Sequence, residues 1–198
     1  MSTSSPAPRK NLFALTALNV LRGAHNSIYG VIWQPFVLSL GASMPTLGLL
    51  NSIGGMGGIV TTLIQSLGGW LADRIGRKPL ILLSSLAIIA GYALFALAGA
   101  LHVWTLLLLG IVILGASSVA RPALGAITAE SAHAERQGSA FSQMQVAALV
   151  PGIIVPVLGG ALADRFGYVL IFVLSIGLEV YAAVMVRLRS DRADRTHR

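Results

Sequence analysis

The sequence predicts an all-α integral membrane protein, with six transmembrane helices arranged as two inverted three-helix repeats. Three observations lead to this fold class. First, 55% of the 198 residues are hydrophobic and only 11% are charged, with a mean hydropathy of +0.79, whereas a soluble domain carries about a quarter charged residues. Second, six apolar stretches are each long enough to cross a bilayer, which takes about 20 residues. Third, an 11-residue pattern from the first half of the chain recurs in the second half.

The apolar stretches divide the chain into its expected elements. The predicted spans lie near residues 12–40, 46–72, 79–101, 104–128, 139–161 and 166–186. Between them, residues that favour turns or helix ends occur at 40–45, 73–79, 100–104, 129–138 and 164–168. We therefore expect a short N-terminal segment at 1–11, a six-helix bundle at 12–186 with repeats of about 12–101 and 104–186, and a basic tail at 187–198.

Lysine and arginine in the loops predict the orientation. If the spans alternate, eleven basic loop and tail residues fall on one face of the membrane and only Arg165 falls on the other. Basic loops face the cytoplasm, so we expect a multi-pass protein of the cell (inner) membrane, in contact with the lipid bilayer, with both termini cytoplasmic. The net charge of +7 does not indicate nucleic-acid binding, because the basic residues lie in short flanks and form no patch.

The repeated pattern predicts how the two halves are related. GGWLADRIGRK at 68–78 recurs as GGALADRFGYV at 159–169, and seven of the first nine positions agree. The two positions that follow differ, since Arg77-Lys78 is replaced by Tyr168-Val169. The first copy falls on the expected cytoplasmic face and the second outside, so the loss of positive charge follows the orientation rule. Two copies in opposite orientations predict inverted three-helix repeats, an architecture of secondary transporters.

GGWLADRIGRK also resembles a family signature. It is similar to the loop between spans two and three of the major facilitator superfamily, usually written G-x-L-a-D-R-x-G-R-K, and LSLGASMPTLGLL at 38–50 resembles the family's preceding loop. The resemblance implies the N-terminal six-helix half of a transporter that usually has twelve spans. The positions that match the signature are Gly69, Leu71, Ala72, Asp73, Arg74, Gly76, Arg77 and Lys78.

The resemblance implies transport of a small solute by alternating access, with a second six-helix bundle completing the pathway. That bundle would be a second copy of the chain or a separate transporter half; a truncated or non-transporting membrane protein, or an interaction module, is the alternative.

The family's gating loop implies a role in conformational change, although a turn without gating function remains open. Ile111 occupies the position of an arginine found in drug–proton antiporters, so the resemblance favours a general superfamily transporter over proton-coupled drug efflux. A coupling ion stays open. The implied gating residues are Gly69, Asp73, Arg74, Gly76, Arg77 and Lys78.

Charged residues within the spans are candidates for function, because charge is costly in a bilayer. Arg22, Arg121 and Glu179 lie at similar expected depths, roughly 12–15 Å from the cytoplasmic face at 1.5 Å per residue, and Asn26 lies one turn beyond Arg22. In the family, spans one and four line the cavity, which implies substrate contacts at Arg22, Asn26 and Arg121 and an anionic or polar ligand. Glu179 is a further candidate or a partner of Arg121, and His25 is a proton carrier or a packing residue.

The glycines, serines and motifs outside these positions indicate a structural role and no enzyme activity. We interpret the glycines of the second span as helix-packing residues. Serines at 117 and 118 invite comparison with intramembrane serine proteases, but the sixth span contains no histidine to form a dyad. The chain has no cysteine, no zinc-protease motif and no phosphate-binding loop, so we expect no enzyme activity, cofactor or metal. The second-span glycines are Gly48, Gly54, Gly55, Gly57 and Gly58.

Overall fold

The computed structural model is helical throughout the part of the chain that it describes, which comprises residues 7–55, 57–130, 138, 142–143, 145–146 and 149–196. The expected all-helical class is confirmed there. Helices end or begin within four of the breaks expected from the sequence, and most of the remaining one, 129–138, lies outside the described residues. The helices are α1 (Ala7–Ser39), α2 (Met44–Gly54), α3 (Ile59–Ile75), α4 (Arg77–Leu101), α5 (Leu106–Ala116), the 3₁₀ helix η1 (Ser117–Ala120), α6 (Arg121–Glu130), α8 (Pro151–Phe166) and α9 (Tyr168–Thr196).

Within the described residues, three helical stretches are long and apolar enough to cross a membrane: Met44–Ile75, Pro79–Leu101 and Leu106–Ala126. Tyr168–Val184 is a shorter apolar helix. Most of the first half of the fifth expected span, 139–161, lies outside the described residues. In the sixth, α9 extends past residue 186 to Thr196, so the basic tail continues the last helix.

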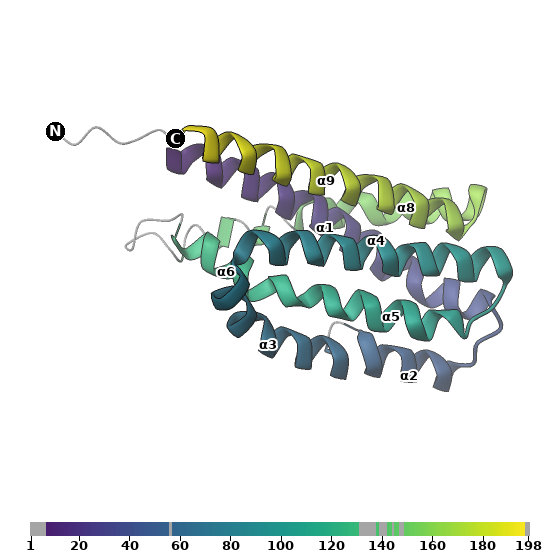
Figure 1. Ribbon diagram of the computed structural model, residues 1–198. Helices are drawn as coiled ribbons and strands as arrows, with labels where there is room; N and C mark the ends of the chain where they lie inside the picture. Colours follow the sequence, from purple (N-terminus) through teal and green to yellow (C-terminus); the bar gives the residue numbers. More distant parts are fainter. Residues whose placement is uncertain are drawn as a thin grey trace.

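Helix α4 is central to the bundle, with α5 on one side and α9 on the other (Figure 1). Helix α1 packs against α8, and α3 packs against η1 and α6. The start of α1, the α3–α4 turn, the end of α6 and the end of α9 all lie at the left of Figure 1. The α1–α2, α4–α5 and α8–α9 connections lie at the opposite end. The described connections therefore fall into two groups at opposite ends of the bundle.

The second expected span is interrupted in its middle. The α-helical pattern stops after Gly54 and resumes at Ile59. Gly54 packs as expected, since a Cβ there would lie 2.5 Å from the backbone oxygen of Ile111. Gly55 and Gly58 instead form the break: the Gly58 N–H donates to the Gly55 carbonyl, and a Cβ on Gly58 would lie 2.8 Å from the nitrogens of Gly54 and Gly55. Glycines have low helix propensity, so a cluster of them favours the interruption.

The fourth expected span changes its helix type in the middle. Helix α5 passes into η1, and α6 follows from Arg121. Pro122 explains the change, because it has no N–H to donate to the carbonyl of Ser118 and its ring would clash with that carbonyl in a regular α-helix. The Arg121 N–H donates to the Ser118 carbonyl instead, which is the tighter 3₁₀ pattern.

The two copies of the repeated pattern adopt the same turn. Gly76 follows α3 with φ +86° and Gly167 follows α8 with φ +81°, a backbone region that favours glycine. Their N–H groups donate to the carbonyls of Ala72 and Ala163. Each turn leads directly into the next helix.

A buried aromatic cluster joins α1, α4 and α9. Phe36 and Phe172 have ring centroids 4.8 Å apart, Phe95 and Phe172 are 5.5 Å apart, and Trp33 and Phe95 are 5.1 Å apart. All four side chains are buried. Aromatic pairs at these spacings add stability beyond that of the buried area, so this cluster fixes the helices that carry the site.

Candidate functional site

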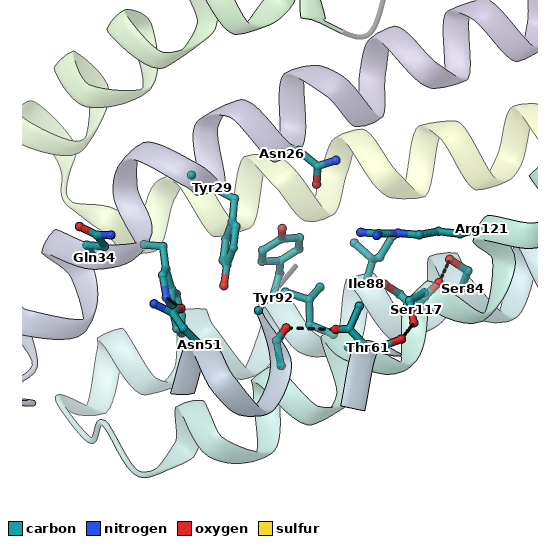
Figure 2. A pocket seen from close by; sticks show the side chains of 17 residues that line it. Asn26, Tyr29, Gln34, Asn51, Thr61, Ser84, Ile88, Tyr92, Ser117 and Arg121 are labelled. Atoms are coloured by element: carbon teal, nitrogen blue, oxygen red, sulfur yellow. Dashed lines mark hydrogen bonds between the residues drawn. The ribbon is translucent and has the colours of Figure 1, made fainter. Parts of the chain in front are cut away.

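A cavity of about 330 Å³ opens between the first, second, third and fourth expected spans. Its lining is mixed, with amide, hydroxyl and aromatic side chains and one arginine. Figure 2 shows Arg121 extending across Ile88 toward Asn26 and Tyr92. The lining residues are Asn26, Tyr29, Gly30, Trp33, Gln34, Asn51, Gly54, Gly55, Thr61, Ser84, Ile88, Tyr92, Leu114, Gly115, Ser117, Ser118 and Arg121.

The aromatic wall of the cavity is held by the core. Tyr29 on α1 is half-buried, and its ring lies 5.2 Å from Trp33, 6.1 Å from Tyr92 and 6.2 Å from Phe95, centroid to centroid. The contacts with Tyr92 and Phe95 tie α1 to α4. The Tyr29 ring is therefore presented to the cavity by packing against three other rings.

The segment that precedes Arg121 is fixed by hydrogen bonds from two other helices. Ser84 Oγ on α4 donates to the Ser117 carbonyl at 2.7 Å, and Ser118 Oγ donates to the Thr61 carbonyl on α3 at 3.0 Å. Gly68 of α3 packs so closely on η1 that a Cβ there would meet the Val119 backbone oxygen. These contacts hold η1 in place, so that Arg121, the first residue of α6, projects into the cavity.

The non-helical backbone between α2 and α3 also faces the cavity. Gly54 and Gly55 line it, and Thr61 Oγ1 donates to the Gly54 carbonyl at 3.4 Å. Trp33 Nε1 donates to Asn51 Oδ1 at 2.8 Å, which links α1 to the end of α2. Non-helical backbone at membrane depth is tolerated where it lines a cavity, so the break belongs to the site.

The structure separates the charged residues that the sequence placed at equal depth. Arg121 is exposed and lines the cavity together with Asn26, but Glu179 on α9 is only 2% exposed and does not line it. Glu179 Oε1 accepts a hydrogen bond of 2.7 Å from Ser85 Oγ on α4. Arg22 and His25 lie on α1, and their side chains are outside the described part of the structure.

The residues of the family-like loop lie at the α3–α4 turn, away from the cavity. Asp73 and Arg74 are exposed, and the Arg74 guanidinium carbon lies 4.2 Å from the centre of the Trp70 ring. Gly69 faces open space, because a Cβ there would meet nothing within 4 Å. Gly76 forms the turn, and the side chains of Arg77 and Lys78 are outside the described residues.

Sequence reasoning missed most of the polar lining. The missed residues are uncharged, and an uncharged polar residue in an apolar span does not by itself indicate a site. They are Gln34, Asn51, Thr61, Ser84 and Ser118. Two signals were present, namely the run of glycines at 54–58 and the proline directly after Arg121. Both mark helix interruptions, and both interruptions lie at the cavity. No cluster of His, Asp or Glu suited to a metal occurs among the described residues.

Comparisons with known proteins identify the family of the chain. The family model of the Major Facilitator Superfamily matches residues 15–198. The multidrug resistance protein MdtG of Serratia proteamaculans (strain 568) is 28% identical over 193 residues, which cover 93% of this chain and 46% of the relative. The chain thus spans about half the length of the curated relative that it matches.

A solved structure has the same fold. A mutant of the peptide transporter POT in complex with alafosfalin matches with a TM-score of 0.63 at 20% identity, over 90% of this chain and 38% of that one. At that identity the likeness shows the fold alone. The family match, the apolar helices and the shared fold together lead to one conclusion: the chain is a multi-pass membrane protein that belongs to the Major Facilitator Superfamily.

Proposed function

We propose that the chain is one six-helix half of a secondary transporter and supplies one wall of its solute pathway. The observation that carries this proposal is the cavity, because it is lined by polar side chains and by the interrupted backbone of α2–α3 in an otherwise apolar bundle. Interrupted helices at the midplane are typical of transporter binding sites. Asn26 and Arg121 are the solute contacts in this proposal.

The packing of the helices supports inverted repeats within this half. If spans one, two and three correspond to four, five and six, then α3 against η1 should correspond to α8 against α1. Gly68 of α3 faces Val119 of η1, and the matching Gly159 of α8 faces Ile28 of α1. Helices α4 and α9, which correspond to each other, pack together.

The same correspondence supports the proposed sidedness. The α3–α4 turn lies at the same end of the bundle as the start of α1 and the end of α9. Its counterpart, the α8–α9 turn, lies at the opposite end. The first end carries the basic loop and tail residues. Both termini are therefore cytoplasmic in this proposal. The exposed Asp73 and Arg74 would then face the cytoplasmic edge of the second bundle, where they take part in gating.

The second bundle is a copy of this chain or a separate half. Alternating access requires two bundles that rock against each other around the site. The chain should therefore form a two-bundle particle, and reconstituted vesicles should take up solute only when both bundles are present. Size measurement in mild detergent, followed by flux assays on the same particle, tests this. A particle that stays a single bundle in the membrane and carries no flux would instead favour a non-transporting protein.

A further inference from the structure

The cavity lining carries a single formal charge. Of the 17 described residues that line it, Arg121 is the only charged one, and no carboxylate is among them. Glu179 lies in the core, accepts a hydrogen bond from Ser85 and is not among the lining residues. A charge at membrane depth is unfavourable unless it is paired or solvated. The lining therefore favours a ligand that carries one negative charge.

Hydrogen bonding inside the lining determines which donors are left for a ligand. The hydroxyl groups of Thr61, Ser84 and Ser118 donate to backbone carbonyls, so their hydrogens are already engaged. The carbonyl oxygen of the Asn51 side chain accepts from Trp33, which leaves its NH₂ group as the donor. The donors that remain for a ligand are therefore this NH₂ group, the guanidinium of Arg121 and the amide of Asn26. Arginine binds a carboxylate through two parallel hydrogen bonds.

The remaining wall is suited to a flat apolar body. Tyr29, Trp33 and Tyr92 line the cavity beside Ile88 and Leu114. The Tyr29 ring packs against the rings of Trp33 and Phe95, so its orientation is fixed before a ligand arrives. A preorganised ring binds another ring with little loss of conformational entropy. The volume of about 330 Å³ fits a ligand of one or two rings.

We propose that the solute bound by this cavity is an aromatic monocarboxylate, with its carboxylate on Arg121 and its ring against Tyr29. This proposal rests on the transport function proposed above and names the substrate class of the same cavity. Asn26 and Asn51 add donors at the carboxylate end. The aliphatic side chains of Ile88 and Leu114 cover the edge of the ring.

Calorimetric titration of the full chain in lipid nanodiscs tests the class with four probes. They are 2-naphthoate, its neutral amide, its saturated decahydronaphthalene analogue and 2-naphthylmethylammonium. We expect 2-naphthoate to bind at least about tenfold more tightly than the amide, because hydrogen bonds to a charged group are worth more than neutral ones. The saturated acid should bind about two- to tenfold more weakly than 2-naphthoate, since it lacks the ring contact. The ammonium probe should not bind.

Variants assign the two ends of the site. Arg121→Gln should weaken 2-naphthoate binding by about 10- to 100-fold, and Arg121→Lys should restore part of it. Arg165→Gln is the matched control, because Arg165 is an exposed arginine at the end of α8. Tyr29→Leu should weaken 2-naphthoate binding but leave the saturated acid unchanged. Melting temperatures of all variants confirm that they fold.

Three results would overturn the proposal: no binding of 2-naphthoate, equal binding of the ammonium or amide probe, or unchanged binding in Arg121→Gln. The same experiments distinguish failure of this substrate class from failure of the proposed transport function. A two-bundle particle that carries flux but fails these titrations keeps the transporter and loses the substrate class. A single-bundle protein that binds 2-naphthoate as described keeps the site and loses the transporter.

Discussion

Arg121 and Glu179 show how differently two intramembrane charges are used in one bundle. Both are costly in an apolar environment, and the sequence places them at similar depth. Arg121 projects into the cavity, whereas Glu179 is buried against Ser85. The position of Arg121 suits ligand binding, and that of Glu179 suits the joining of α9 to α4.

Substitutions at Glu179 and Ser85 should therefore be coupled. Glu179→Leu and Ser85→Ala should each lower the melting temperature, because each leaves the other polar group buried without this partner. The double variant should lose less than the sum of the two, by about 1 kcal/mol. Thermal unfolding of the two singles and the double measures this coupling.

The matched control combines Glu179→Leu with Arg121→Gln. Arg121 lines the cavity, so its loss should add to that of Glu179 without coupling. A coupling with Arg121 larger than that with Ser85 would mean that the two charges form an ion pair in the membrane. The assignment of Glu179 to the α4–α9 contact would then be wrong.

At the scale of elements, glycines decide how closely helices approach. Gly68 and Gly69 are neighbours on α3, yet only Gly68 faces η1. A Cβ at Gly68 would collide with the backbone oxygen of Val119, and backbone cannot give way as a flexible side chain can. A Cβ at Gly69 would meet nothing within 4 Å. Substitution of Gly69 is therefore the matched control for substitution of Gly68.

Gly68→Ala should destabilise the protein by roughly 1–3 kcal/mol, the usual cost of overpacking. Because η1 holds Arg121, the same change should also weaken binding at the cavity. Gly69→Ala should be neutral or slightly stabilising, since alanine has the higher helix propensity. Chemical or thermal denaturation of both variants provides the comparison. Equal losses would show that the close α3–η1 contact does not exist in the membrane.

The sequence predicted the helical class, the four breaks that lie within the described residues and the repeated turn, because hydropathy and turn residues are local signals. It predicted two of the cavity residues, Asn26 and Arg121, as solute contacts. It did not predict the breaks within spans, because the glycines at 54–58 and Pro122 are also compatible with packing and kinks. Nor did it separate Glu179 from Arg121, since depth along a helix does not fix the face on which a side chain lies.

At the scale of the whole molecule, the connections fall at two ends of the bundle. Cysteine labelling tests which end faces the cytoplasm, and the chain contains no cysteine of its own to interfere. Single cysteines at Ser43 and His102, both exposed, should react with an impermeant reagent added outside cells. A cysteine at Ser190, on the basic end of α9, should react only after permeabilisation. The reverse pattern would invert the proposed orientation.

The central claim is that this cavity is the solute site of an alternating-access transporter. A single cysteine at Gln34, an exposed lining residue of α1, tests it most directly in vesicles that contain the two-bundle particle. Alternating access predicts that impermeant reagent reaches this cysteine from either side, and that bound solute slows the two reactions by different factors. Reaction from one side only, at the same rate with and without solute, would show a closed pocket and contradict the account.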